Sequence, residues 1–271
     1  MPDAFLFDLD GTLYAGGAAV PGAAAAVAAL RARGIPCRFL TNTTTLPRSG
    51  LVARLAGFGF EVSVDEIVTP LRSATAILRG AGIRSVMPFV AQAALEDLDG
   101  FELIGGTAGG RGGGIESAPS ALPPSRLPAV LIGDLGSAWG FDLMQSAFQL
   151  LHGGARFVAL SRDRYFQSRQ GLTLDAGPFV AALEYATGRS AEVVGKPSEG
   201  YFREALATLG PGIDPARVAM VGDDLWSDIQ GAQRVGCQAW LVRTGKFRQA
   251  ALDESSVVPD QIIDSVAELG A

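Results

Sequence analysis

Short apolar runs that end at polar residues recur along this chain. The first, residues 4–7, has the length and composition of a strand that is buried on both faces. An alanine-rich stretch at 22–33 has helical composition, with Pro21 near its start and Gly34 at its end. Residues 37–40 form a second short apolar run. The pattern predicts a β-α-β unit with parallel strands and a right-handed crossover.

The same alternation continues to the end of the chain. Further strands are predicted at 86–90, 129–132, 157–160, 218–221 and 237–242. Helices are predicted at 71–78 and 199–209, with a mixed helical stretch at 133–151 and a last short strand and helix within 261–269. Strands that alternate with helices are typical of parallel sheets. We therefore expect an α/β fold with a Rossmann-like, doubly wound parallel sheet.

The regular pattern is interrupted in the middle of the chain. It loosens near residue 70 and resumes near residue 190, which predicts a core domain of 1–70 and 190–271 and an inserted α/β cap domain of 71–189. Residues 105–128 are dense in Gly, Pro and Ser and predict a surface insertion that buries little. This tract lacks the GK[ST] ending of a phosphate-binding loop.

Composition narrows the class of protein. With 271 residues, 48% hydrophobic and 18% charged, the chain is long enough for two ordinary domains. The net charge of -6 gives no reason to expect nucleic acid or an acidic membrane as a partner. The first residues lack the basic stretch of a secretory signal, and the uncharged segment 15–30 is broken by Pro21. We expect a cytoplasmic protein that does not bind membranes; a homo-oligomer is compatible with the sequence.

Few side chains other than acids are available for chemistry. Cys37 and Cys237 lie in apolar runs, so we expect both to be small, buried hydrophobic side chains. His152 is the only histidine, which excludes histidine-based zinc sites, and no GxSxG motif is present. Lysine occurs only at positions 196 and 246, so each lysine stands out. The acids must therefore carry the reaction.

Asp8 and Asp10 follow the first strand directly. Side chains two residues apart point the same way in extended backbone, and two neighbouring carboxylates repel unless a cation, a shared proton or water separates them. A plain turn is one alternative, because Asp and Gly favour turns. A calcium-binding loop is excluded, since Leu13 and Ala19 occupy the positions that require Gly and Glu. A divalent metal is the preferred interpretation.

Polar residues also follow three later apolar runs. Thr41 and Asn42 come after the strand at 37–40, where open α/β sheets bind ligands, although a helix-capping loop is the alternative. Lys196 precedes a helix, and because the N-terminal dipole disfavours a cation there, its presence indicates a bound anion. A further group of acids follows the strand at 218–221: Asp223, Asp224 and Asp228.

Four motifs in this order resemble those of the haloacid dehalogenase superfamily of phosphohydrolases. They are DLDGT at 8–12, TN at 41–42, GKP at 195–197 and GDDLWSD at 222–228. The long segment between the second and third motifs is similar to the branch with an inserted α/β cap, which includes NagD-like enzymes and 4-nitrophenylphosphatases. Residues 172–202 most resemble the subgroup of phospholysine phosphohistidine inorganic pyrophosphate phosphatase and its hydrolase-like relative. The insertion at 105–128 departs from that pattern.

The resemblance implies a role for each matching residue. Asp8 would be the nucleophile that becomes an aspartyl phosphate, and Asp10 the general acid and base. The implied phosphate-binding residues are Thr41, Asn42 and Lys196. The implied Mg²⁺ ligands are Asp8, the carbonyl of Asp10 and Asp223, supported by Asp224 or Asp228. A cation that bridges the nucleophile and the phosphate would relieve their repulsion, and lysine suits a tetrahedral anion.

The expected substrate is a small phosphorylated metabolite, or pyrophosphate or a phosphoramidate, and the inserted domain is expected to select it. A phospho-accepting signalling receiver also uses Asp, Thr, Lys and Mg²⁺, but receivers are single small domains and lack the DLDGT opening. Dehalogenase chemistry is disfavoured by Asp10, whereas phosphotransfer to another acceptor stays open.

Overall fold

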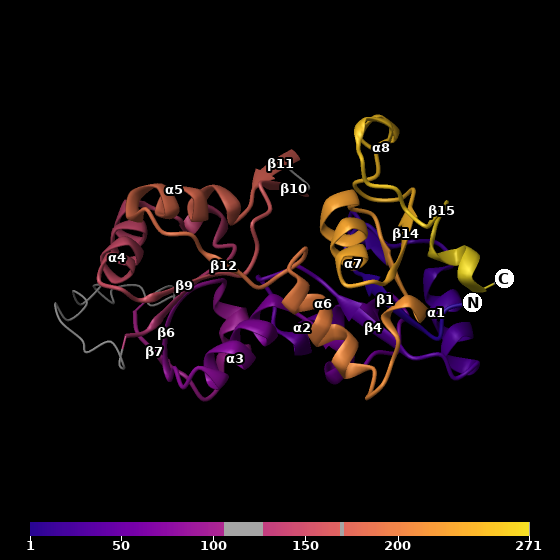
Figure 1. Ribbon diagram of the computed structural model, residues 1–271, viewed down its shortest axis with the longest axis horizontal. Coiled ribbons are helices and arrows are strands. Elements are labelled where there is room, and N and C mark those ends of the chain that lie inside the picture. Colours follow the sequence, from indigo (N-terminus) through magenta and orange to yellow (C-terminus); the bar gives the residue numbers. More distant parts are fainter. Residues whose placement is uncertain (106–126, 169–170, 271) are drawn as a thin grey trace. The chain divides into compact units, whose positions relative to one another are not determined.

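The computed structural model describes residues 1–105, 127–168 and 171–270. The chain divides into two compact units (Figure 1). The first unit comprises residues 1–41, 48–68 and 196–271, and the second comprises 42–47 and 69–195. Most of the insertion predicted at 105–128, namely 106–126, lies outside the described residues.

A six-stranded sheet organises the first unit. Its order is β15-β14-β13-β1-β4-β5, and every neighbouring pair is parallel. The strands are β1 (Ala4–Asp8), β4 (Cys37–Leu40), β5 (Ile67–Val68), β13 (Val218–Gly222), β14 (Gln238–Val242) and β15 (Gln261–Ile263). Because the strands are parallel, all their carboxyl ends lie at one edge, and this edge collects the residues that follow β1, β4 and β13.

Strand β1 lies in the middle of this sheet because both of its faces are apolar. Leu6 belongs to a buried cluster with Phe202 and Ile229 on one face. On the other face Phe7 stacks on Phe39, with 6.1 Å between ring centroids, and helix α1 (Ala23–Ala32) places Arg31 over the Phe39 ring. Successive strand residues point to opposite faces, so helices cover the sheet on both sides.

Helices and short turns complete the first unit. The helices are α1 (Ala23–Ala32), α2 (Arg48–Gly57), α6 (Glu199–Thr208), α7 (Gly231–Arg234) and α8 (Gln249–Glu254). Shorter helical turns are η1 (Val64–Glu66), η5 (Pro215–Arg217), the π-helix η6 (Leu225–Gln230) and η7 (Val266–Gly270). A two-stranded pair, β2 (Tyr14–Ala15) and β3 (Ala18–Ala19), follows β1.

The second unit has a parallel sheet of its own, in the order β12-β9-β8-β6-β7. Its strands are β6 (Ser85–Phe89), β7 (Glu102–Leu103), β8 (Ala129–Ile132), β9 (Arg156–Ala159) and β12 (Glu192–Val193). One face packs on α3 (Pro70–Gly80) and η2 (Gln92–Leu98), the other on α4 (Phe141–His152) and α5 (Gly177–Thr187). A turn, η4 (Gly136–Ala138), and an antiparallel hairpin, β10 (Tyr165–Ser168) and β11 (Gly171–Leu174), complete it.

The structure confirms the α/β class and the Rossmann-like parallel sheet, and it corrects some element boundaries. The strands predicted at 37–40 and 129–132 match β4 and β8. The helix expected within 133–151 begins only at Phe141, because Gly133, Gly136 and Gly140 precede it. The strand expected from Cys237 begins one residue later, at Gln238.

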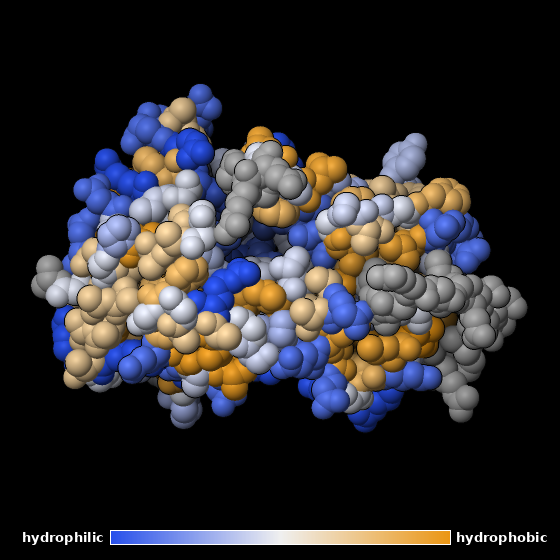
Figure 2. Space-filling view, turned by 180° about the vertical axis from the view of Figure 1, so that it is seen from behind, coloured by the Kyte–Doolittle hydropathy of each residue, from blue (hydrophilic) through white to orange (hydrophobic). Residues whose placement is uncertain are grey.

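Helices in the described part of the chain are all too short or too polar to cross a membrane. On the face drawn in Figure 2, hydrophilic and hydrophobic residues are interspersed.

Candidate active site

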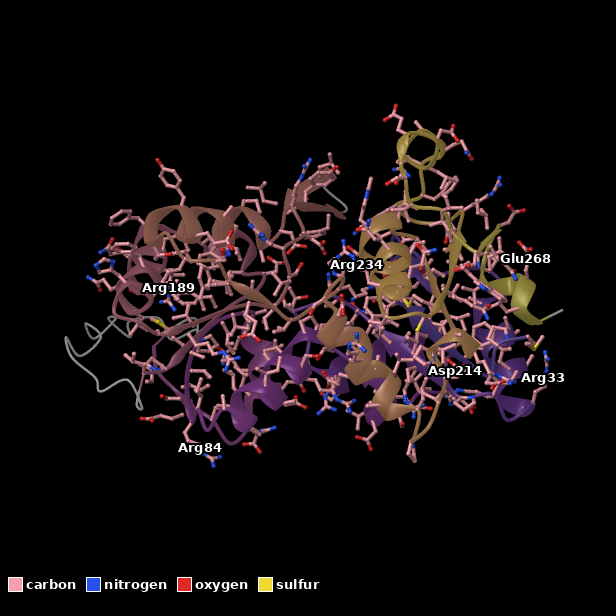
Figure 3. All side chains as sticks on the ribbon, in the orientation of Figure 1. Arg33, Arg84, Arg189, Asp214, Arg234 and Glu268 are labelled. Carbon is pink, nitrogen blue, oxygen red and sulfur yellow. The ribbon has the colours of Figure 1, made fainter. Side chains whose placement is uncertain are left out.

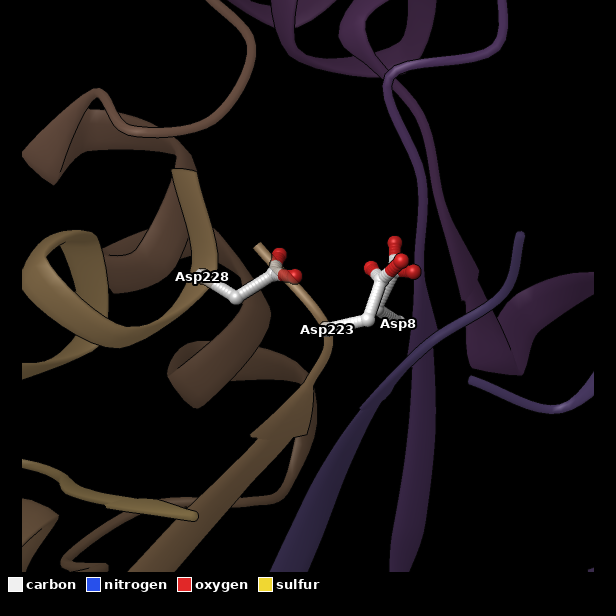
Figure 4. A group of neighbouring side chains, drawn as sticks. All are labelled: Asp8, Asp223 and Asp228. Atoms are coloured by element: carbon white, nitrogen blue, oxygen red, sulfur yellow. The ribbon is translucent and has the colours of Figure 1, made fainter. Parts of the chain in front are cut away.

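Three buried carboxylates meet at the carboxyl edge of the first sheet (Figure 4). Asp8 is the last residue of β1, Asp223 follows β13, and Asp228 lies in η6. Each offers one oxygen, and these three oxygens lie within 4.8 Å of one another. The parallel pairing of β1 with β13 produces this meeting, because it brings chain segments more than 200 residues apart to one edge.

Lys196 is the buried cation of this group. Its Nζ donates to Asp8 Oδ1 and, over 2.7 Å, to Asp228 Oδ1, and the lysine is only 4% exposed. Burial alone would lower the pKa of Lys196, but the charges of Asp228 and Asp8 outweigh burial and raise it well above the usual range. Lys196 therefore stays protonated, as an anion-binding group requires.

Three glycines make room for the acids. A Cβ on Gly222 would lie 2.3 Å from Asp228 Oδ2, and a Cβ on Gly11 would lie 1.9 Å from Asp223 Oδ2. A Cβ on Gly245 would lie 2.0 Å from the same Asp223 oxygen. Such distances are far below van der Waals contact, so each carboxylate occupies the space that a side chain would fill.

The buried acids favour bound protons in the absence of a cation. Burial raises the pKa of Asp223 well above its usual range, and the charges of Asp8 and Asp228 add to this. Burial also raises the pKa of Asp228 to about 7, although Lys196 opposes the shift. Three acids face one lysine, which leaves a formal charge of -2 when all are ionised. A divalent cation would balance that charge, and an all-oxygen donor set suits a hard cation.

Asp10 lies outside the three-carboxylate group and is exposed. The turn that holds it is closed by a hydrogen bond of 2.7 Å from Gly11 N to the Tyr14 carbonyl. Partial loss of hydration and the charge of Asp8 raise the pKa of Asp10. A carboxyl group that holds its proton more strongly than usual is suited to general acid catalysis.

Thr41 lies at the same edge of the sheet. Its neighbour Leu40 pairs in register with Asp8, so Thr41 is the first residue beyond that pair. Thr41 is 2% exposed, and its N–H donates to the Tyr201 hydroxyl over 3.0 Å and to the Val68 carbonyl over 3.3 Å.

Asn42, by contrast, belongs to the second unit. There its amide nitrogen donates to Asp163 Oδ2 over 3.1 Å. A Cβ on Gly195 would lie 2.6 Å from Asn42 Oδ1, so the glycine before Lys196 admits this side chain.

Asp224 supports the turn that contains Asp228. Its Oδ1 accepts hydrogen bonds from the main-chain N–H groups of Trp226 and Ser227, over 3.0 and 2.9 Å, and so caps η6. Its Oδ2 pairs with Lys246 Nζ over 3.1 Å. A π-turn then directs Asp228 back into the cluster, and π-turns are frequent at functional sites.

Sequence reasoning missed two contributors to this edge. Thr12 is fully buried and donates to Asp8 Oδ2 over 3.3 Å, although it belongs to the DLDGT motif. Residues 244–246 form a loop after β14: Thr244 donates to the Gly11 carbonyl over 2.5 Å, and Lys246 N donates to Asp223 Oδ2 over 2.6 Å. The scarcity of lysine was the signal that could have revealed this loop.

The labelled Arg33 and Arg84 are exposed (Figure 3), whereas the buried charged residues in the described part of the chain are Asp8, Lys196, Asp223 and Asp228. Among the described residues, Asp8, Asp223 and Asp228 are the only group of acids, cysteines or histidines arranged to hold a metal ion. The chemistry of the first unit therefore concentrates at one sheet edge.

The central strand of this parallel sheet ends in a carboxylate that is salt-bridged to a buried lysine beside two further acids, an arrangement that suits an α/β enzyme. A model of the haloacid dehalogenase-like hydrolases matches residues 5–103, and a model of HAD-like hydrolases matches residues 193–269. The chain belongs to the haloacid dehalogenase-like hydrolase family, as its resemblance indicated.

Relatives of known sequence match nearly the whole chain. Human haloacid dehalogenase-like hydrolase domain-containing protein 2 is 39% identical over 256 residues, covering 94% of this chain and 89% of the relative. Human phospholysine phosphohistidine inorganic pyrophosphate phosphatase is 35% identical over 269 residues, covering 97% and 91%.

Solved structures agree with both units. The p-nitrophenyl phosphatase from Archaeoglobus fulgidus has a TM-score of 0.84 and 28% identity, with 99% of this chain and 98% of that chain covered. The glycerol phosphate phosphatase from Mycobacterium tuberculosis, in complex with magnesium, has a TM-score of 0.81 and 26% identity, with coverage of 99% and 76%. The two-unit architecture is therefore shared with phosphatases.

Proposed function

We propose that this protein is a magnesium-dependent phosphohydrolase that acts on small phosphorylated molecules through a phosphorylated Asp8. The observation that carries the proposal is the position of Asp8, which is buried at the end of the central strand and bound by Lys196 and Thr12. Membership of a hydrolase family with phosphatase relatives supports it.

Asp8 and Asp10 divide the proton and phosphoryl transfers between them. A carboxylate oxygen of Asp8 attacks phosphorus while the bond from phosphorus to the leaving oxygen breaks, and Asp10 gives its proton to that oxygen. Water then attacks the phosphorus of the acyl phosphate, and Asp10 takes a proton from it. Phosphate leaves, and both carboxyl groups return to their starting states.

Lys196 and Thr41 are proposed to hold the phosphoryl oxygens. Lys196 is a compact charge fixed by two acids, so it is already oriented before substrate binds. Asn42 is a further proposed phosphate contact, and its role depends on the second unit.

The proposed magnesium ligands are Asp8, the main-chain carbonyl of Asp10 and Asp223, supported by Asp228. When bound, magnesium would neutralise the charge that builds up as a carboxylate approaches a phosphate. Asp224 is proposed to support the site through η6 and Lys246, because its carboxylate is engaged there.

Substrate choice is proposed to reside in the second unit, 42–47 and 69–195. The named relatives act on pyrophosphate, p-nitrophenyl phosphate and glycerol phosphate, so small esters, pyrophosphate and phosphoramidates form the proposed set. The test is continuous measurement of phosphate release from each compound with Mg²⁺, ranked by kcat/KM. Multiple turnovers are expected; stoichiometric phosphorylation without release would instead indicate a phospho-accepting protein.

A further inference from the structure

Tyr201 connects three main-chain groups at the site edge through one hydroxyl. The hydroxyl accepts from Thr41 N over 3.0 Å, and it lies 2.9 Å from the Thr41 carbonyl and 2.6 Å from the Val68 carbonyl. Tyr201 is 1% exposed, so water does not replace these bonds. A hydroxyl has one proton, and the two carbonyls share it.

The Tyr201 hydroxyl binds the chain at the two places where it leaves the first unit. Thr41 directly follows β4 and Val68 ends β5, at the two places where the chain leaves the first unit, and Lys196 is the first residue after its second return. Tyr201 follows Lys196 by five residues, in α6. One side chain on the helix after the phosphate-binding lysine therefore fixes both strand ends.

We propose that Tyr201 is a positioning residue that fixes Thr41 for phosphate binding. Thr41 is the last residue before the chain leaves the first unit, and the Tyr201 hydroxyl lies within 3.0 Å of both its N–H and its carbonyl oxygen. The Tyr201 bonds therefore oppose displacement of the Thr41 main chain. The inference rests on the proposed role of Thr41 in phosphate binding.

The test combines Tyr201→Phe, which removes only the hydroxyl, with Thr41→Val, which removes the threonine hydroxyl but keeps the main-chain bonds. Binding of inorganic phosphate in the presence of Mg²⁺ is measured by calorimetry for the wild type, both variants and the double variant. Loss of the buried hydrogen bonds is expected to weaken phosphate binding about 3- to 10-fold in Tyr201→Phe. In the Thr41→Val background the same change is expected to add less than about 2-fold, because it acts through Thr41.

Two controls separate positioning from loss of stability. Phe202→Leu alters the adjacent buried residue of the same helix without removing a polar contact, and it is expected to lower the unfolding temperature but leave phosphate binding unchanged. Hydrogen exchange of residues 37–41 should accelerate in Tyr201→Phe and not in Phe202→Leu.

The outcomes for Thr41 and for Tyr201 can be distinguished. Unchanged phosphate binding in Thr41→Val would overturn the role of Thr41 in the proposed function. Weakened binding in Thr41→Val together with unchanged binding in Tyr201→Phe, or fully additive effects in the double variant, would overturn the role of Tyr201 alone.

Discussion

The two units contain sheets of the same kind with different residues at their edges. Both sheets are parallel and have helices on both faces. At the carboxyl edge of the first, Asp8, Asp223 and Asp228 lie together, and Lys196 pairs with Asp8 and Asp228. In the second, the main-chain N–H of Asp134, just beyond β8, donates to the Thr44 hydroxyl over 2.8 Å.

Polar residues at the second edge form hydrogen bonds with one another. Asp163 accepts from Asn42, and its own main-chain N–H donates to the Ser161 hydroxyl over 3.0 Å. No lysine lies among these contacts, and no acid group suited to a metal was found in the described part of that unit. A parallel sheet brings the carboxyl ends of its strands together at one edge, but the residues that follow the strands determine which chemistry is possible there.

Removing one carboxylate from each edge gives the largest expected contrast. Asp8→Asn should lower kcat by on the order of 10⁴-fold or more, because an amide cannot accept the phosphoryl group in its place. Asp134→Asn should change kcat by less than about 3-fold and serves as the control. Phosphate release and thermal unfolding are measured on both. If Asp8→Asn and Asp134→Asn both fold and lose kcat to a similar extent, the chemistry does not belong to the first edge alone.

Asp10→Asn tests whether Asp10 and Asp8 have different roles at the first edge. Its raised pKa suits proton donation, which a poor alkoxide leaving group needs and 4-nitrophenolate hardly needs. Water activation is needed for every substrate, and losing it costs roughly 10²–10⁴-fold.

With a 4-nitrophenyl ester, this variant should accumulate a phosphoenzyme on Asp8 that mass spectrometry detects after rapid quenching. Label on a serine, threonine or lysine, or any adduct in Asp8→Asn, would show that another residue is the nucleophile.

The loop at 244–246 should produce an intermediate effect. Gly245→Ala would place a Cβ 2.0 Å from Asp223 Oδ2, at a φ of +59° that disfavours side chains. Groups that orient a metal ligand typically contribute 10- to 100-fold to affinity, and a loss of roughly that size in Mg²⁺ binding is expected by calorimetry.

Lys246→Met is the matched control for this loop, because it keeps the N–H bond to Asp223 and removes the lysine charge, which pairs with Asp224 and opposes the rise in the pKa of Asp10 and Asp223. A change below about 3-fold is expected. If Lys246→Met is the more damaging variant, the lysine charge rather than the loop's main chain supports Asp223.

The smallest effect is a shift in unfolding temperature with pH. In the metal-free protein, burial raises the pKa of Asp228 from 3.8 to about 7, and its proton stabilises the fold below that range. This contribution is lost as pH rises towards 7 and beyond, so the metal-free protein should unfold at a lower temperature at pH 8 than at pH 5.

Mg²⁺ favours the ionised acids, so saturating Mg²⁺ should raise the unfolding temperature at pH 8 by about 5 °C and by less at pH 5. An equal shift at both pH values would exclude linkage between metal binding and these protons.

The sequence was sufficient for the sheet and for the acids at its edge, because both depend on local pattern. The apolar run at 4–7 ends where Asp8 begins the site, and the acids at 223–228 follow β13 directly. The choice between Asp224 and Asp228 was not accessible, because it depends on how η6 turns and on which acid caps it.

Tyr201 was also beyond sequence reasoning. It reads as an ordinary buried aromatic residue, and its polar contacts are to main-chain groups 160 and 133 residues away. A side chain that binds only main-chain atoms of distant segments leaves no motif of its own. The same reason hides the bond from Lys246 N to Asp223.

The pairing of β1 with β13 has a consequence for synthesis of the protein on the ribosome. Ala4 lies opposite Val218 in the parallel pair of β1 and β13. More than 200 further residues must therefore be synthesised after β1 before β13 is available to pair with it. Residues 69–195 have all been made by then. The nascent chain therefore cannot bring Asp8 and Asp223 together until β13 and Asp223 have been synthesised, and until then β1 is a hydrophobic segment of the kind that chaperones bind.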